Sequence, residues 1–152
     1  MKTQRRQRHI KKTAKNARIY NRGGSNRNAE VVAFFLEMLN TIKLYHWKTR
    51  SYSQHKATDM LFESLQSNID KFVEVMLGKS RSVERVKMFQ KCLRIFDFSK
   101  KSEFREQIFE YREFLLRISQ FFDKERDSDL LNIRDEMVAD INQFLYLLTF
   151  DK

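Results

Sequence analysis

The sequence predicts an all-α fold, in which four helices form one bundle behind a basic N-terminal tail. The chain contains no proline and only three glycines, and 33% of its residues are charged. This composition suits long helices joined by short loops. Apolar residues also recur at spacings of three and four along most of the chain, as they do on amphipathic helices. Because 152 residues suffice for one hydrophobic core, we expect a single domain with a tail.

The tail is defined by its charge. Residues 1–28 contain ten Lys or Arg and no acidic residue, and they end in the stretch Gly23-Gly24-Ser25-Asn26. The rest of the chain contains 20 basic and 20 acidic residues, so the tail accounts for the whole formal charge of +10. We therefore expect residues 1–28 to be a flexible or partner-ordered arm and residues 29–152 to be the helical bundle.

Two amphipathic helices are expected in the first half of the bundle. The first begins after Asn28 as its N-cap and runs to about Arg50. The second runs from about His55 to Gly78, a residue that commonly ends helices. Their apolar stripes contain Val31, Phe34, Phe35, Met38, Leu39, Ile42 and Tyr45 in the first helix, and Leu61, Phe62, Leu65, Ile69, Phe72 and Met76 in the second.

The second half is expected to contain a connection and two more helices. A short helix around Val83 to Leu93 lies in the connection, the third helix spans about Ser102 to Phe122, and the fourth follows a cap at residues 127–129. Two helical hairpins joined by a long middle connection are the topology of ferritin-like bundles. The prediction for residues 29–152 is thus a ferritin-like four-helix bundle with a short extra helix in the crossover.

Five residues on the first two helices form a pattern of metal ligands, and they are His46, His55, Asp59, Asp70 and Glu74. On the second helix the four candidates fall within about 100° of one another, on a stripe separate from the apolar face. Imidazole nitrogens and carboxylate oxygens suit iron, manganese or zinc. The pattern therefore indicates a metal site.

The spacing of these residues indicates a site shared between two chains. His55 and Asp70 are fifteen residues apart, or about 22 Å along a helix, so one chain cannot bring them together. If two copies of the second helix pack antiparallel across a twofold axis, the His55 end of one meets the Asp70 end of the other. We therefore expect a homodimer, or a larger homo-oligomer, formed through the second helix.

Three stretches carry a resemblance to a known family. They are Lys43-Leu44-Tyr45-His46-Trp47-Lys48, His55-Lys56-Ala57-Thr58-Asp59 and Ile69-Asp70-Lys71-Phe72-Val73-Glu74. They resemble the Dps group of ferritin-like proteins, the starvation-induced DNA-binding miniferritins, and they are similar to small ferritin-like proteins of large DNA viruses. In the Dps group, a histidine before a tryptophan ends helix one, and an HxxxD pair and a DxxxE pair lie on helix two.

The resemblance implies an iron-oxidising function. By this likeness His46, His55 and Asp59 would act from one subunit, and Asp70 and Glu74 from its partner. Such proteins oxidise iron(II), usually with peroxide, and store it in a twelve-subunit shell. Two other interpretations stay open: His46 as a packing residue bonded to a carbonyl group, and the stripe on the second helix as an ordinary solvated face.

The tail is a candidate nucleic-acid-binding arm, since it can neutralise phosphates without reading sequence. A nuclear-localisation signal, an RNA-binding arm or an arm that docks on an acidic protein surface are alternatives. The residues concerned are Arg5, Arg6, Arg8, Lys11, Lys12, Lys15, Arg18, Arg22 and Arg27.

Two functional hypotheses follow. The first is a Dps-like ferroxidase that also binds DNA non-specifically and so protects or compacts it. The second is a non-enzymatic virion structural or DNA-packaging protein, built on the same bundle with a vestigial metal site. The single cysteine excludes an intramolecular disulfide, and no secretory signal or membrane span is visible. We expect an intracellular protein, in cytoplasm or nucleus, or one packaged in a virion.

Overall fold

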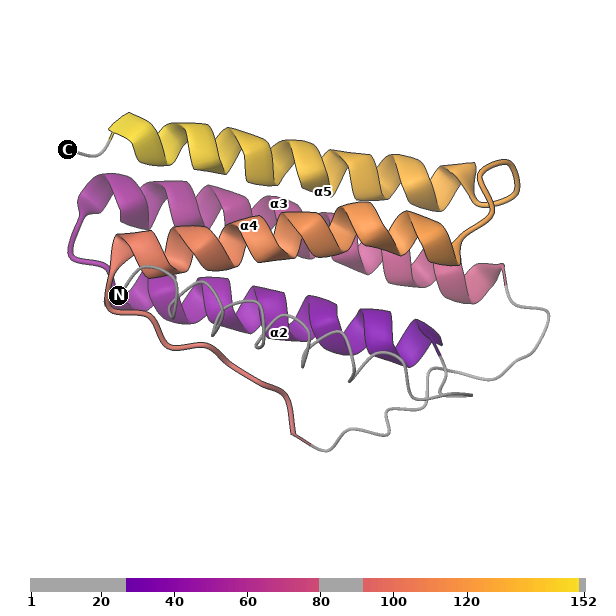
Figure 1. Cartoon of the computed structure of the whole chain (residues 1–152), viewed down its shortest axis with the longest axis horizontal. Helices are drawn as coiled ribbons and strands as arrows, with labels where there is room; N and C mark the ends of the chain where they lie inside the picture. Colours follow the sequence, from indigo (N-terminus) through magenta and orange to yellow (C-terminus); the bar gives the residue numbers. More distant parts are fainter. Residues whose placement is uncertain (1–26, 80–91, 151–152) are drawn as a thin grey trace, which may run out of the picture.

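A computed structural model describes residues 27–79 and 92–150, and these residues form helices and loops without any β-strand (Figure 1). None of the helices in these two ranges is long and apolar enough to cross a membrane. Within these ranges, the all-α prediction with four main helices is confirmed. The helices are α2 (Arg27–Lys48), α3 (Tyr52–Gly78), α4 (Lys101–Ile118) and α5 (Ser128–Leu147), with short 3₁₀ turns at Ser119–Phe121 and Leu148–Phe150.

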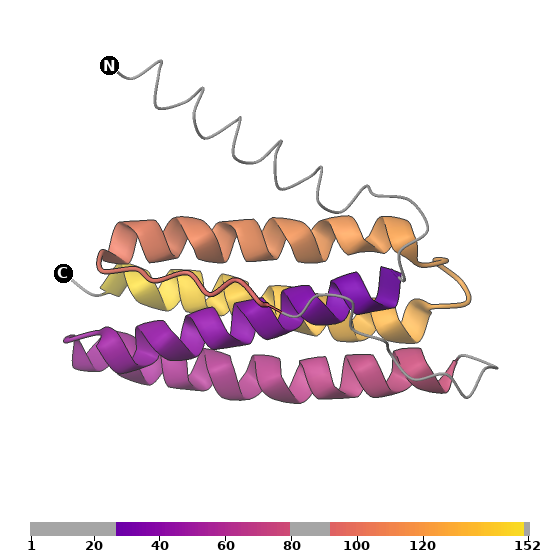
Figure 2. The same ribbon diagram turned by 90° about the horizontal axis from the view of Figure 1, so that it is seen from below.

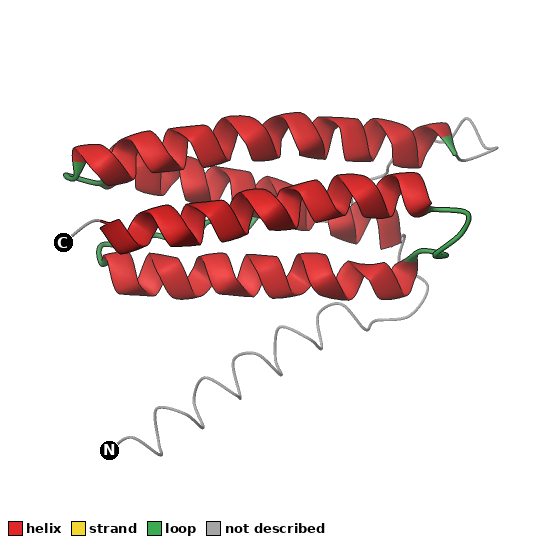
Figure 3. Cartoon of the chain, turned by 90° about the horizontal axis from the view of Figure 1, so that it is seen from above, coloured by secondary structure: helices red, strands yellow, loops and turns green. Residues whose placement is uncertain are grey.

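The four helices form two antiparallel hairpins (Figure 1). Helix α3 packs against both α2 and α5, and α4 packs against α5. The α2–α3 turn and the α4–α5 loop lie at opposite ends of the bundle (Figure 3). Because α3 and α4 run in the same direction, the chain between them must return along the length of the bundle.

The described part of that return, residues 92–98, runs beside α2 (Figure 2). The backbone N–H of Arg94 donates to Glu37 Oε1 over 2.9 Å, and that of Phe96 donates to Thr41 Oγ1 over 3.3 Å. The side chain of Phe98 packs against the hydrophobic core. Polar side chains of α2 therefore hold residues 92–98 in place, although this segment has no regular secondary structure.

Aromatic rings from all four helices occupy the core. Phe35 of α2 and Phe72 of α3 are fully buried and meet edge to face, with their centroids 5.4 Å apart. Phe104 of α4 stacks on Tyr45 at 3.7 Å and meets Phe144 of α5 edge to face at 6.1 Å. Such rings each bury a large apolar area and prefer these relative orientations. The two hairpins therefore pack against each other through a common core.

The boundaries of α2 differ from the sequence-based prediction. Asn28 lies inside the helix, which begins at Arg27, so its proposed role as N-cap is wrong. The helix ends at Lys48, two residues before the expected end at Arg50. The nucleic-acid candidate Arg27 is thus the exposed first residue of α2, whereas the other eight tail candidates lie outside the described residues.

Helix α3 begins three residues earlier than expected because Ser51 caps it. The Ser51 hydroxyl accepts a hydrogen bond from the Gln54 N–H over 3.3 Å, which satisfies one of the free donors of the first turn. The segment 51–54 was expected to be a loop, and most of it is helical. The predicted end at Gly78 is confirmed.

The extra helix predicted in the crossover is not confirmed. Most of the segment from Val83 to Leu93 lies outside the described residues, and its last two residues, Cys92 and Leu93, are not helical. Helix α4 also ends at Ile118, before the expected Phe122, and continues as a 3₁₀ turn.

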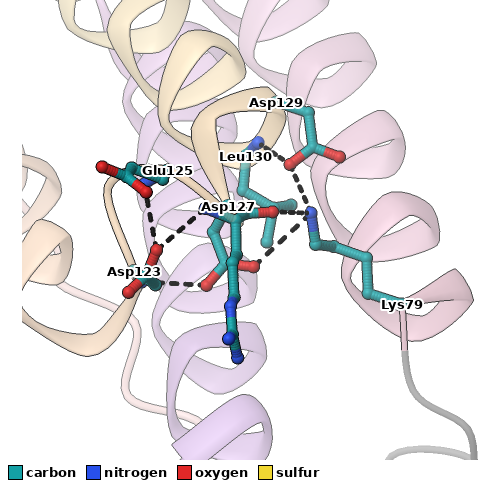
Figure 4. A network of polar contacts seen from close by, with 7 residues as sticks. Lys79, Asp123, Glu125, Asp127, Asp129 and Leu130 are labelled. Atoms are coloured by element: carbon teal, nitrogen blue, oxygen red, sulfur yellow. Dashed lines mark hydrogen bonds and ion pairs between the residues drawn. The ribbon is translucent and has the colours of Figure 1, made fainter.

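A lysine joins the end of α3 to the α4–α5 loop (Figure 4). The Lys79 ammonium lies 2.6 Å from Asp129 Oδ1 and 3.4 Å from Asp127 Oδ1, and it donates to the Arg126 carbonyl over 2.6 Å. Hydrogen bonding to Asp129 raises the pKa of Lys79, and the same bond lowers the pKa of Asp129. This contact holds the two hairpins together at the end of the bundle opposite the α2–α3 turn.

The loop itself is folded around Asp123. Its carboxylate accepts hydrogen bonds from the backbone N–H groups of Arg126 (2.8 Å) and Glu125 (3.0 Å), which lower the pKa of Asp123. In return, the Asp123 N–H donates to Asp127 Oδ2 over 2.9 Å. Asp127 stands at the N-cap position of α5 as predicted, but its side chain bonds back to the loop instead of capping the helix.

The lysine contact predicts a pH dependence of stability with a definite sign. The lowered pKa values of Asp123 and Asp129 stabilise the fold above the ordinary aspartate pKa of about 3.9, and this contribution is lost as the pH falls below it. The raised pKa of Lys79 stabilises the fold below about 10.4 and is lost as the pH rises further. Lys79→Met should lower Tm slightly near neutral pH and flatten the loss of stability above pH ~10.4, measured by circular dichroism.

A second prediction concerns the core. Phe72→Ala should lower the free energy of unfolding by about 3–5 kcal/mol in urea titrations, because it leaves a cavity in the core beside Phe35 and Phe122. Leu116→Ala is the matched control, since Leu116 is 42% exposed and should change stability by less than about 0.5 kcal/mol. Equal losses in the two variants would contradict the described core.

Candidate metal centre

A tight turn between α2 and α3 brings the two candidate histidines together. The buried Tyr45 hydroxyl donates to Gln54 Oε1 over 2.5 Å, and the Thr49 hydroxyl donates to the same oxygen over 3.2 Å. Tyr45 is itself stacked on Phe104. Buried polar groups are costly unless they are paired, so this network favours one conformation of the turn.

Across this turn, the ring of each histidine, His46 and His55, lies within hydrogen-bonding distance of the backbone carbonyl oxygen of the other. The rings stack with centroids 3.9 Å apart and planes 24° apart. Nδ1 of His46 lies 3.0 Å from the carbonyl oxygen of His55, and Nδ1 of His55 lies 3.0 Å from the carbonyl oxygen of His46. Carbonyl groups in the last turn of a helix lack a partner within the helix, and the His55 ring supplies one to His46.

These contacts assign the tautomer of both rings. A carbonyl oxygen only accepts hydrogen bonds, so each Nδ1 must carry the proton. In the neutral form each Nε2 then has a free lone pair. Metal-binding histidines usually have this arrangement, in which the second ring nitrogen donates to a carbonyl or carboxylate group and fixes the orientation of the ring.

Asp59 lies beside the histidine pair. Its Oδ1 is 3.7 Å from Nε2 of His46, and His46 is only 6% exposed. An ion that sits about 2.1 Å from each atom can bridge donors up to about 4.2 Å apart, so this spacing is compatible with a shared metal ion. The one-turn separation of His55 and Asp59 places both on the same side of α3.

The same carboxylate also faces a cation. Lys43 Nζ lies 3.5 Å from Asp59 Oδ1, and the same ammonium lies 4.5 Å from the centroid of the Phe62 ring. Without a metal ion, the charge of Asp59 is therefore balanced by Lys43. The interpretation of His46 as a packing residue bonded to a carbonyl group fits these contacts as well.

Asp70 and Glu74 lie apart from this cluster. Both are exposed on the second half of α3. Asp70 lines an open groove of about 490 Å³ between α2 and α3, together with Leu36, Leu39, Glu63, Gln66, Ser67 and Ile69. Within the described parts of one chain, no three His, Cys, Asp or Glu side chains converge as a metal-binding group.

Four residues that were not among the candidate ligands also belong to this site. Tyr45 and Gln54 set the turn, and Lys43 faces Asp59. The buried Thr58 hydroxyl lies 3.3 Å from Nδ1 of His46 and donates to the His55 carbonyl over 3.0 Å. The only sequence signal for Thr58 is its position three residues after His55, which places it one turn along the same helix.

The comparison with protein families adds one result. Residues 46–148 match the profile of a family described as "Family of unknown function (DUF5856)", and this range begins at His46 and includes all five candidate ligands. No curated protein and no solved structure shows a significant match to the chain. Because the family profile covers well over half of the chain, the protein belongs to the DUF5856 family.

Proposed function

We propose that the protein is a ferritin-like iron-binding protein that oxidises iron(II) at a site shared between two copies of the chain. His46, His55 and Asp59 supply ligands from one subunit, and Asp70 and Glu74 supply them from the other. The observation that carries this proposal is the reciprocal pair of imidazole–carbonyl contacts, which directs both Nδ1 protons to the backbone and leaves both Nε2 atoms as donors to a metal ion.

The connectivity of the bundle supports the ferritin-like part of the proposal. Helices α3 and α4 run in the same direction and are joined by one long return past α2. A bundle with a single long crossover is the arrangement found in ferritin-like proteins. In such bundles, metal ions are bound by side chains from facing helices.

Iron suits the proposed ligands. Imidazole and carboxylate groups bind Fe(II), and the negative carboxylates favour the higher charge of Fe(III) after oxidation. With hydrogen peroxide as oxidant, two iron(II) ions each lose one electron, and the peroxide and two protons become two water molecules. Zinc and manganese accept the same ligands, so they are the competing metals.

The second half of the proposed function is non-specific DNA binding through residues 1–28, supported by their ten basic and no acidic residues. Iron oxidation beside DNA would remove iron(II) and peroxide before they react with it. The alternative is a virion structural or DNA-packaging protein, which needs the arm and the dimer contact but no working metal site.

A complementation experiment tests the shared site. His55→Asn removes Nε2 but keeps a side-chain donor for the His46 carbonyl, and the double change Asp70→Ala and Glu74→Ala removes the other half. Each variant alone should lose iron(II) oxidation, followed by absorbance after peroxide addition. After unfolding and refolding together, half of the dimers are mixed and each has one intact site, so about a quarter of the wild-type activity should return.

The control for lost charge is Glu106→Ala plus Glu136→Ala, two exposed acids on α4 and α5, which should keep full activity. Melting curves of each variant exclude unfolding as the cause of any loss. If the mixture stays inactive although mixed dimers form, the ligands are not shared. If wild-type protein neither binds nor oxidises iron, the structural alternative takes the place of the enzyme.

The tail has its own test. Deleting residues 1–26, which leaves α2 intact from Arg27, should weaken binding to duplex DNA at least tenfold. It should also make the slope of log affinity against log salt concentration shallower, because several fewer counterions are released on binding. Iron oxidation should be unchanged. Fluorescence anisotropy of a labelled duplex at several salt concentrations measures both quantities, and an unchanged salt dependence would exclude the tail as the DNA-binding element.

A further inference from the structure

One end of the bundle carries a group of exposed aromatic side chains. Trp47 is 70% exposed, Tyr52 76%, Tyr146 63% and Phe150 64%. Large aromatic residues are usually at least half buried, because each removes a large apolar area from water. Four such residues exposed at one end of the bundle therefore indicate a ligand-binding surface.

These residues belong to one end of the molecule although they are far apart in sequence. Figure 1 shows the α2–α3 turn, the start of α4 and the end of α5 at the same end. The stacking of Tyr45 on Phe104 joins the end of α2 to the start of α4, and Lys101 Nζ donates to the Leu148 carbonyl over 3.5 Å. The first half of α3 and the last turns of α5 line a common groove of about 230 Å³.

The same end is basic. Residues 47–56 contain three basic residues, Lys48, Arg50 and Lys56, and no acidic one. Lys48 is paired with Asp97, whereas Arg50 and Lys56 are exposed, and Lys56 follows Tyr52 by one helical turn. Two further lysines are the N-cap residue Lys100 and the first residue Lys101 of the neighbouring α4, and Lys100 lies 3.8 Å from Glu103. Positive charge thus predominates around Trp47 and Tyr52.

We propose that this end binds single-stranded nucleic acid. Unpaired bases stack on Trp47 and Tyr52, and Arg50 and Lys56 contact the phosphates that follow. Exposed aromatic rings beside basic side chains are the combination used to bind single strands without sequence preference. A duplex is a poorer ligand, because its bases are already stacked and paired and only its phosphates are available.

The charges argue against a second copy of the same end as the occupant. A symmetric contact would bring together two surfaces that both carry Arg50 and Lys56, and like charges in a desolvated contact are unfavourable. The proposed surface consists of residues of the bundle, whereas the tail can bind any polyanion through charge alone. It does not depend on the proposed iron site, so each can fail without the other.

The single tryptophan provides a direct test, because Trp47 is the only one in the chain. Oligothymidylate is titrated into the full-length protein in the presence of a chelator, and tryptophan fluorescence is recorded. Stacking of a base on the indole should quench it in a saturable way, and a duplex of equal length should quench it much less.

Variants of Tyr52 separate stacking from other effects. Tyr52→Ala should weaken the affinity for oligothymidylate by about 5- to 150-fold, whereas Tyr52→Phe, which keeps the ring, should stay within about twofold of wild type. The matched control is Phe121→Ala at the opposite end of the bundle, where the side chain is 44% exposed, and it should have no effect. Arg50→Glu should weaken binding and reduce its salt dependence.

Three results would overturn the proposal. The first is retention of the oligonucleotide without quenching, which assigns binding to the tail alone. The second is an equal loss in Tyr52→Phe and Tyr52→Ala. The third is a change in fluorescence that follows the concentration of the protein and not that of the oligonucleotide, and that is absent in Tyr52→Ala. Such a result would identify this end as a contact between copies of the chain.

Discussion

The hydrogen-bonded turn between α2 and α3 is the constraint on which the rest of the structure depends. The reciprocal contacts of His46 and His55 join the last turn of one helix to the first turn of the next. The buried bond from Tyr45 to Gln54 holds the same turn, and the Tyr45 ring stacks on α4. The turn thereby orients the histidines, sets the pairing of α2 with α3 and exposes Trp47 and Tyr52 at one end of the bundle.

Both ends of the bundle are held by polar contacts, but of different kinds. At the turn, buried hydroxyl, amide and imidazole groups are hydrogen-bonded, which gives a rigid arrangement that suits a metal ligand set. At the opposite end, Lys79 connects α3 to the α4–α5 loop through exposed carboxylates, where water and salt screen the charges. The contacts at the α2–α3 turn therefore fix the relative positions of the helices more strongly than the contacts of Lys79 do.

Sequence periodicity predicted the helices better than their ends. Phe35, Leu65 and Phe72 follow the apolar spacing and are fully buried, as expected. Asn28 failed as an N-cap because α2 already includes it, and Ser51 capped a helix whose start was placed at His55. Capping depends on a single hydrogen bond at the end of a helix, so residue type alone leaves several positions open.

The sequence by itself determined the all-α class, the four helices, the concentration of positive charge in residues 1–28 and the separation of Asp70 from His55, because these follow from residue spacing and composition. The tertiary structure decided the pairing of His46 with His55, the tautomer of each ring, the approach of Asp59 and Lys43, and the gathering of exposed aromatic residues at one end. Those features join atoms from different helices, and only the packing of the helices brings such atoms within bonding distance.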